Sequence, residues 1–154
     1  MEIIIRKATL EDRNILQLLN DQVFIDNAKY DPDLNLEWAK SELGEKYFSD
    51  LLQDPKAFCI IASYGKKNIA YLAGRPKSID YRKSKYVELE NMGVIPEFHS
   101  QRVGSRLIKE FFDWAKKASF DKVILSAYSK NKQAIEFYKK HGLTNIDVSL
   151  EKSL

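Results

Sequence analysis

The chain has 154 residues, enough for one domain with a substantial hydrophobic core. Its apolar fraction of 44% is that of a globular protein, and its net charge of +3 lacks the strong basic character expected of a nucleic-acid-binding protein. No apolar run approaches the length of a membrane span and no signal-peptide pattern is present, so the sequence predicts a cytoplasmic protein.

The first third of the sequence predicts a strand and two helices. Residues 2–8 alternate apolar and polar side chains, as a strand does. The hydroxyl of Thr9 is expected to cap a first helix, and a polar loop follows over 26–35. A second helix is expected over about 36–52. The predicted buried face of the first helix consists of Ile15, Leu18, Leu19 and Val23.

Two β-rich runs, residues 57–63 and 68–74, are separated by four residues that predict a hairpin. The single cysteine, Cys59, lies in the first run. It has no partner for an intramolecular disulfide, and we expect it to be a small buried apolar side chain. A polar connection over 75–85 leads to the second half of the chain.

The second half predicts strand, helix, strand, helix and strand. The expected ranges are 86–94, about 102–117, 122–128, 131–141 and about 143–150. The complete order is β-α-α-β-β-β-α-β-α-β, with no repeat and no linker. This order predicts a single α+β domain over residues 1–154, with a mixed sheet covered by helices.

The strand over 86–94 contains an irregularity. Val87 and Leu89 share one face, but the next apolar residue, Met92, follows after three positions instead of two. A slip in a period of two indicates a β-bulge, and Gly93 beside it permits the close approach of a backbone or a ligand. Ordinary strand irregularity explains the same pattern equally well.

A polar turn, His99-Ser-Gln-Arg-Val-Gly104, precedes the helix over 102–117. The first amides of a helix have no internal partners and carry the positive end of the helix dipole, so a diphosphate fits there. Arg102 and Arg106 add positive charge, and the hydroxyl of Ser105 can donate a hydrogen bond. By itself the signal is weak, because many helices begin after such a turn.

The last predicted helix has clear ends. Asn131 is a good cap residue, and Gly142 favours the left-handed conformation that ends helices. Tyr138 shares a face with Ala134 and Ile135, which alone is typical of a tyrosine that packs in the core.

Together these segments resemble the GCN5-related N-acetyltransferase (GNAT) superfamily. The residues Asn131, Ala134, Tyr138 and Gly142 match the family's Asn-x-x-Ala-x-x-x-Tyr-x-x-x-Gly-Phe, with Leu143 in place of the Phe. The resemblance implies a mixed, mostly antiparallel sheet of six to seven strands flanked by about four helices.

The family's phosphate turn has the pattern Arg/Gln-x-x-Gly-x-Gly/Ala. It falls here on His99, Ser100, Gln101, Arg102, Val103 and Gly104. His99 stands where Arg or Gln is usual, and Arg102 stands where the first Gly is usual. We expect ordinary backbone angles at Arg102, where a glycine would be free, and a contact from its charge to the diphosphate. These departures predict weakened rather than lost binding of CoA.

The resemblance implies acetyl-CoA as the cosubstrate and no metal. The implied cofactor-binding residues are Met92, Gly93, Val94, His99, Ser100, Gln101, Arg102, Val103, Gly104, Ser105, Asn131, Ala134 and Tyr138. The other implied partner is an amine acceptor, and a homodimer is left open. Neither nucleic acid nor a membrane is an expected partner.

The implied reaction is direct acetyl transfer to a primary amine in a ternary complex, without a covalent enzyme intermediate. Glu88 aligns with the strand glutamate that often serves as the base, and Glu90 is the reserve candidate. A glutamate with a pKa of about 4.3 needs burial or a water relay to deprotonate an ammonium with a pKa of about 10. Either residue is equally well explained as a solvated carboxylate.

Two further groups complete the implied mechanism. A backbone amide between Met92 and Val94 is expected to stabilise the negative charge that develops on the thioester oxygen. Tyr138 is expected to protonate the departing thiolate.

The sequence does not identify the acceptor. Tyr30, Trp38 and the acids Asp26, Asp31 and Asp33 form either a wall for a cationic amine or a solvated loop. Two other interpretations stay open. One is a CoA-binding module without transferase activity, which the altered turn favours, and the other is a small α/β interaction protein without a CoA site.

Overall fold

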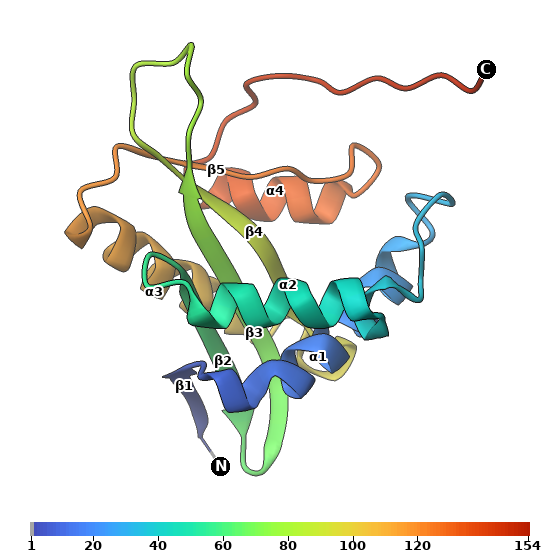
Figure 1. The fold of residues 1–154 in the computed structure, drawn as a ribbon, viewed down its shortest axis with the longest axis vertical. Coiled ribbons are helices and arrows are strands. Elements are labelled where there is room, and N and C mark those ends of the chain that lie inside the picture. The colour runs from blue at the N-terminus through green and yellow to red at the C-terminus, as the bar shows by residue number, and fades with distance from the viewer. Residues whose placement is uncertain (1) are drawn as a thin grey trace.

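The computed structural model describes residues 2–154 (Figure 1). Its strands lie side by side in one sheet, in the same order as in the sequence. They are β1 (Ile3–Lys7), β2 (Phe58–Tyr64), β3 (Lys67–Lys77), β4 (Tyr86–Val94) and β5 (Lys122–Ile124). The pairs from β1 to β4 are antiparallel, and β5 runs parallel to β4. The mixed, mostly antiparallel sheet is therefore confirmed, as is the hairpin, in which Tyr64 pairs with Lys67.

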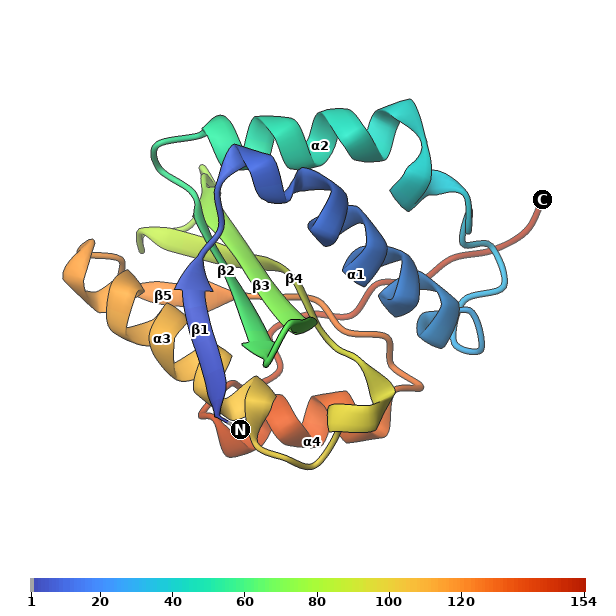
Figure 2. The same cartoon turned by 90° about the horizontal axis from the view of Figure 1, so that it is seen from below.

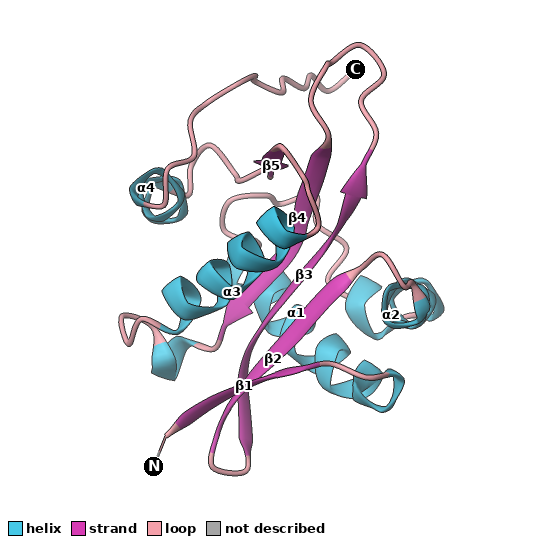
Figure 3. Ribbon diagram, turned by 90° about the vertical axis from the view of Figure 1, so that its left-hand side faces the viewer, coloured by secondary structure: helices cyan, strands magenta, loops and turns pink. Residues whose placement is uncertain are grey.

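Four α-helices cover this sheet. They are α1 (Arg13–Asn27), α2 (Glu42–Gln53), α3 (Val103–Lys117) and α4 (Lys132–Lys140). Short 3-10 turns precede three of them, at Leu10–Asp12, Trp38–Lys40 and Pro96–Phe98. Figures 2 and 3 show α1 and α2 on one face of the sheet and α3 and α4 on the other. No helix within residues 2–154 is long and apolar enough to cross a membrane.

The face under α3 is apolar because α3 repeats large apolar side chains every three or four positions. Its buried residues are Val103, Leu107, Ile108, Phe111 and Ala115. They pack against Leu72 of β3 and against Val87 and Leu89 of β4. Val87 and Leu89, which the sequence predicts on one face of β4, therefore both point into this core.

The face under α1 and α2 has its own core, which includes Leu16, Leu19, Phe48 and Cys59. Cys59 is buried, as predicted, and burial raises the pKa of its thiol to about 12. The prediction for Leu18 was wrong, since this residue is 65% exposed. It lies about 200° around the helix from Leu16, which is fully buried, so both cannot face the sheet.

Thr9 is the N-cap residue of the first helical turn, as predicted, and it forms a capping box with Asp12, whose carboxylate accepts from the Thr9 amide (2.7 Å). The second helix begins later than expected, at Glu42, with the hydroxyl of Ser41 accepting from the amide of Gly44 (3.4 Å).

The strand count was overestimated, since five strands and not six to seven form within residues 2–154. β5 ends at Ile124 instead of residue 128, and the segment expected as a strand over 143–150 lies in no sheet of the described chain. A strand needs a hydrogen-bonded neighbour, which a period of two in the sequence does not supply.

The predicted bulge in β4 is confirmed. Ala73 pairs with Asn91 and Gly74 pairs with Leu89, so Glu90 is the extra residue. A bulge places two successive residues opposite one. Glu90 and Asn91 consequently both form hydrogen bonds on the face of α1 and α2, Glu90 with Tyr47 and Asn91 with Asn20. Beyond them, the alternation of side chains between the two faces of β4 is shifted by one residue.

Candidate active site

β4 and β5 separate after the first third of β4. In the described chain their pairing covers 86–88 with 122–124, while β4 continues to Val94. An unpaired strand edge offers its backbone N–H and C=O groups to an extended ligand. Met92 of β4, Gly104 of α3 and Phe137 of α4 meet beside this edge. A methyl group on Gly104 would lie 3.3 Å from Cζ of Phe137 and 3.8 Å from Cε of Met92.

The first turn of α3 is open. Its N-cap residue, Arg102, makes no side-chain cap bond within residues 2–154, and the amide of Arg106 bonds the carbonyl of Arg102 (3.1 Å). The amides of Val103, Gly104 and Ser105 precede that bond and so have no intrahelical acceptor. Arg102 and Arg106 are both exposed. The arrangement fits a diphosphate, for which it supplies backbone donors, the helix dipole and two positive charges.

The backbone at Arg102 corrects the prediction of ordinary angles. Its φ of 62° and ψ of 14° are left-handed, and Ser100 has a φ of 65°. A side chain with a Cβ pays about 1–2 kcal/mol for this conformation. Arg102 therefore adopts a conformation that a glycine would adopt without strain, at a cost to stability.

The side chains of His99 and Gln101 are engaged in shaping this turn. Nε2 of His99 lies 2.8 Å from the carbonyl of Val94 and must donate to it, while Gln101 donates to the carbonyl of Glu97 (3.1 Å). At the same end of α3, the hydroxyl of Ser105 lies 3.2 Å from Nε2 of His141, beyond α4.

α4 has the ends that the sequence predicts. The side chain of Asn131 accepts from the amide of Ala134 (3.1 Å), and Gly142 has a φ of 91°. Tyr138 packs against the cluster under α3, and burial raises its pKa to about 12. Its phenol is therefore neutral at physiological pH and able to donate a proton.

The two candidate bases have different surroundings. Glu90 accepts two hydrogen bonds from Arg75 (2.6 and 2.8 Å) and one from the hydroxyl of Tyr47 (3.1 Å). Burial and the charge of Glu90 raise the pKa of Tyr47, and the hydrogen bonds to Glu90 raise the pKa of Arg75. Glu88 has one ion pair, to Lys77 (3.2 Å). Glu90 is held by three hydrogen bonds from two residues, whereas Glu88 is the freer carboxylate.

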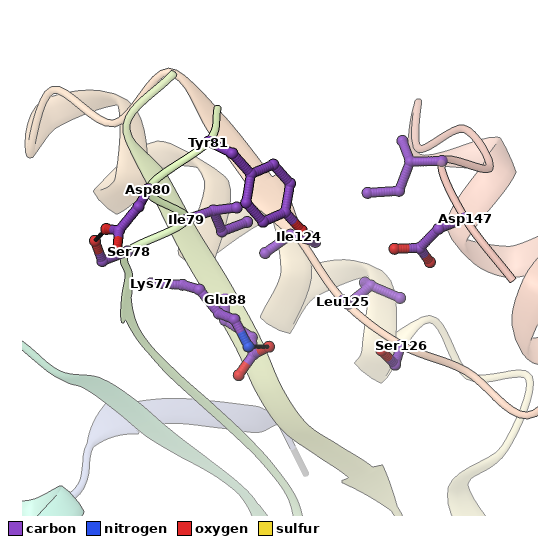
Figure 4. Close-up of a pocket in the computed structure, with 11 residues that line it drawn as sticks. Lys77, Ser78, Ile79, Asp80, Tyr81, Glu88, Ile124, Leu125, Ser126 and Asp147 are labelled. Carbon is purple, nitrogen blue, oxygen red and sulfur yellow. Dashed lines mark hydrogen bonds and ion pairs between the residues drawn. The ribbon is translucent and has the colours of Figure 1, made fainter. Parts of the chain in front are cut away.

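Glu88 borders two hollows of the surface. One, of about 450 Å³, lies between the loop after β3, the end of β5 and the segment after α4 (Figure 4). Figure 4 shows Glu88 and Lys77 on one side of it and Asp147 on the other. The second hollow, of about 430 Å³, is lined by Asp54, Lys56, Arg75, Pro76, Glu88 and Glu90. Both hollows lie at the end of the sheet away from the turn of α3.

A chain of polar side chains crosses the face of α1 and α2, and sequence analysis missed it. The amide nitrogen of Asn20 donates to the hydroxyl of Tyr71 (2.8 Å) and to Asn91 (3.2 Å). Asn91 in turn donates to the hydroxyl of Tyr47 (3.4 Å), which donates to Glu90. The chain thus ties both residues of the bulge to two helices. The signal for this chain in the sequence was Asn20, a polar residue on the buried face of the first helix.

The predicted acceptor wall divides into two parts. Tyr30 stacks on Tyr128 with ring centroids 6.4 Å apart, and the hydroxyl of Tyr128 donates to Asp31 (2.8 Å). This contact joins the loop after α1 to the segment between β5 and α4. Trp38 instead packs against Phe24 and belongs to the rim of the core.

The remaining two residues of that wall make local contacts. Asp26 accepts from Gln22 (3.2 Å), and the amide of Asp33 donates to Asp31 (3.0 Å). Neither of these contacts reaches the edge of β4. Tyr128, which the sequence analysis did not select, is the residue that joins the loop after α1 to the segment between β5 and α4.

Residues 16–143 match the family model described as "Acetyltransferase (GNAT) family". A curated relative, an uncharacterized N-acetyltransferase from Methanocaldococcus jannaschii, is 27% identical over 112 residues, which are 72% of this chain. The match covers 50% of that relative, so the chain spans about half the length of the curated protein it matches.

Solved structures share the fold at low identity. A tetramutant of the BH1408 protein from Bacillus halodurans aligns with a TM-score of 0.83 and 21% identity over 98% of this chain and 99% of its own. The aminoglycoside N-acetyltransferase AAC(6')-Iy in complex with CoA aligns with a TM-score of 0.75 and 14% identity, over 99% and 95%. An aminoglycoside acetyltransferase from a soil metagenomic sample, in complex with sisomicin, has a TM-score of 0.71, 14% identity and coverages of 99% and 96%.

Proposed function

Because the chain belongs to the acetyltransferase (GNAT) family, we propose that it transfers acetyl from acetyl-CoA directly to a primary amine, within a ternary complex. One observation carries this proposal: the open first turn of α3 lies next to the edge at which β4 parts from β5. Acetyl-CoA has a diphosphate that suits the turn and an amide-containing arm that suits the edge.

The diphosphate binds the amides of Val103, Gly104 and Ser105, with Arg102 and Arg106 adding charge. Ser100 and Arg102 contribute through their left-handed backbone, which curls the turn. His99 and Gln101 act as positioning residues, because their side chains bond the carbonyls of Val94 and Glu97. The arm of the cosubstrate pairs with Met92, Gly93 and Val94 and passes Asn131 and Ala134 at the start of α4.

Glu88 is the base, acting through water, and Glu90 is a positioning residue. The observation in favour is that Glu90 is occupied by Arg75 and Tyr47, whereas Glu88 borders both hollows. An ammonium must lose its proton before it can attack, and a water relay allows a carboxylate with a low pKa to remove it.

Tyr138 protonates the thiolate that leaves. Its raised pKa of about 12 keeps the phenol protonated, so the proton is available when the carbon–sulfur bond breaks. An amide between Met92 and Val94 donates to the thioester oxygen as negative charge develops there. The bulge at Glu90 aims these amides, since the period of β4 changes at that point.

The acceptor class is a small cationic amine that enters on the side of α1 and the loop after β3. The acids Glu88, Asp80 and Asp147 line the first hollow, and Asp31 lies beside Tyr128. Neighbours of similar fold are described as aminoglycoside acetyltransferases, one of them bound to sisomicin, so polyamines and aminoglycosides head the substrate panel.

The test is calorimetric titration with acetyl-CoA, comparing two variants of α3 that change the charge equally. Arg106→Glu places an acid in the open first turn, and Lys117→Glu places one in the last turn. We expect micromolar binding by the unaltered protein, at least about 10-fold weaker binding by Arg106→Glu and an unchanged Kd for Lys117→Glu. An assay of free thiol release with the amine panel then measures turnover.

Each outcome separates the interpretations. Binding with turnover supports the transferase. Binding without turnover on any amine supports a CoA-binding module without activity, which the arginine in place of a glycine at position 102 favours. No binding at millimolar acetyl-CoA would refute both and leave an interaction protein.

A further inference from the structure

Both histidines of the chain lie at the turn that leads into α3 or beside its first residues. His141 is the C-cap residue of α4, and its Nε2 lies 3.2 Å from the hydroxyl of Ser105, the third residue of α3. Figure 2 shows these two helix ends next to one another. The imidazole also packs against the ring of Phe137, with centroids 4.7 Å apart. One hydrogen bond between half-buried groups therefore joins α4 to the open turn of α3.

The direction of this hydrogen bond depends on the charge of the imidazole. A serine hydroxyl has one proton to donate, and a neutral imidazole accepts through Nε2 in one of its tautomers. Ser105 then donates to His141. A protonated imidazole carries an N–H at both nitrogens, so Nε2 of His141 must donate and Ser105 must accept. Protonation of His141 therefore releases the proton of Ser105 for another acceptor.

We propose that His141 is a positioning residue for the diphosphate of acetyl-CoA, and that its protonated form frees the hydroxyl of Ser105 to donate to that diphosphate. This inference rests on the proposed function, which places the diphosphate at the first amides of α3. An oxygen of a diphosphate accepts hydrogen bonds but donates none, so it uses Ser105 only when the proton of the hydroxyl is free. The imidazolium also adds positive charge beside the turn. Both effects tighten binding as the pH falls.

The charged groups near this contact are mostly basic. Those within four positions of Ser105 or of His141 are Arg102, Arg106 and Lys109 on α3 and Lys139 and Lys140 on α4. Lys109 is paired with Asp113 (2.7 Å), and in the turn before α3 Glu97 is paired with Lys67 (3.3 Å). Basic neighbours oppose protonation of an imidazole, whereas the C-terminal end of a helix and a bound diphosphate favour it. Binding of the diphosphate should therefore draw a proton onto His141, and the proton in turn should tighten binding.

Calorimetric titration with dephospho-CoA between about pH 5.5 and pH 8 tests the proposal. This probe keeps the diphosphate but lacks the 3′-phosphate, a monoester whose own pKa of about 6 would change the charge of the ligand in this range. We expect the Kd of the parent protein to fall at least about fivefold from pH 8 to pH 5.5. Titrations near pH 6.5 in two buffers of different ionisation enthalpy should also show net proton uptake on binding.

The two histidines supply a matched pair of variants. His141→Gln keeps an amide that can donate to Ser105 but does not titrate, so its Kd should change less than about twofold over the same range. In His99 the Nε2 atom donates to the carbonyl of Val94 (2.8 Å) whether the ring is neutral or charged. His99→Gln should therefore keep the pH dependence of the parent, whatever its effect on the Kd itself.

Ser105→Ala separates the hydroxyl from the charge of the imidazole. This variant should show a smaller pH dependence than the parent, because only the charge of His141 remains. An equal dependence in Ser105→Ala, a dependence that survives in His141→Gln, or a parent Kd that does not vary with pH would overturn the role of His141 and leave the transferase proposal standing. No binding by the parent at millimolar ligand at any pH would refute the cosubstrate site as well, so the two failures are distinguishable.

Discussion

The two faces of the sheet are built from different chemistry. The core under α3 is a cluster of apolar side chains, including Leu72, Leu107 and Phe111. Among residues 2–154 the buried polar side chains, Asp12 and Asn20, both belong to the other face. Burying a polar group costs free energy unless it is hydrogen-bonded. The α3 face is therefore built from apolar packing, whereas the α1 face combines an apolar core with the polar chain from Asn20 that reaches the bulge of β4.

The starts of α1 and α3 show the same contrast. The turn before α1 is closed by Asp12, which also accepts two bonds from Arg6 (2.8 Å each). The first turn of α3 has no such acid and begins with a left-handed arginine. A capped start contributes stability, whereas an open start retains its donors for a ligand. The predictions that follow test this contrast.

The largest expected effect is in the apolar core. Phe111→Ala should lower the free energy of unfolding by about 3–5 kcal/mol, because it removes a fully buried ring that packs against Phe58 and Trp114. Urea denaturation measures the loss. Leu18→Ala, at a 65% exposed position, is the control and should change stability by less than about 0.5 kcal/mol. Equal losses of stability in the two variants would contradict the assignment of Phe111 as buried and of Leu18 as exposed.

Tyr138→Phe should lower kcat about 100-fold, equivalent to about 2.7 kcal/mol in the barrier, and leave the Kd of acetyl-CoA within about twofold. The parent enzyme should also keep its rate at pH 10, because the pKa of Tyr138 is raised to about 12. Stopped assays across pH measure both effects. Tyr64→Phe, in a ring that packs against Phe98, is the control. An unchanged kcat would remove Tyr138 from the mechanism.

Tyr71→Phe tests the polar chain. The change removes the hydroxyl that accepts from Asn20 and donates to Asn91 (3.3 Å), so it should cost about 1–3 kcal/mol through unsatisfied buried groups. If the chain positions the bulge, kcat should fall as well, with a smaller change in Kd. A loss of stability at full kcat would mean that the polar chain serves packing alone.

Asp12→Asn should destabilise the protein by about 1 kcal/mol at pH 7. The pKa of Asp12 is lowered to about 2, chiefly by the hydrogen bonds from Arg6, so its contribution is present above about pH 4 and is lost between pH 4 and 2. The expected loss of stability is small because Arg6 is 43% exposed and water screens its ion pair with Asp12. The two proteins should therefore converge in stability as pH falls to 2, and a constant difference from pH 7 to pH 2 would contradict the ion pair.

Arg102→Gly is expected to have the smallest effect, a gain of about 0.5–1 kcal/mol from release of the left-handed strain, less the added entropy of the unfolded chain. Arg102→Ala keeps the strain and should not stabilise. Both variants lose the same charge, so both should bind acetyl-CoA about two- to fivefold more weakly. Thermal unfolding and calorimetry separate strain from charge. A stabilised Arg102→Ala would show that the gain has another source.

The sequence alone determined the features that are local in the chain. The periods of three to four residues in α3, the cap at Asn131, the end at Gly142 and the slip in β4 all depend on neighbours within a few positions, and each is confirmed. The family pattern added the mixed, mostly antiparallel sheet. These signals predicted the fold well because apolar periodicity and caps depend on residues that are close together in the sequence.

Only the tertiary structure decided which side chains meet. Tyr128 reaches Asp31 across 97 positions and Tyr47 reaches Glu90 across 43, so no local pattern announces either contact. The left-handed angles of Arg102 likewise follow from the path between β4 and α3, against the preference of the residue itself. Strand formation after α4 is of the same kind, since the alternation there needs a partner edge that local sequence does not specify.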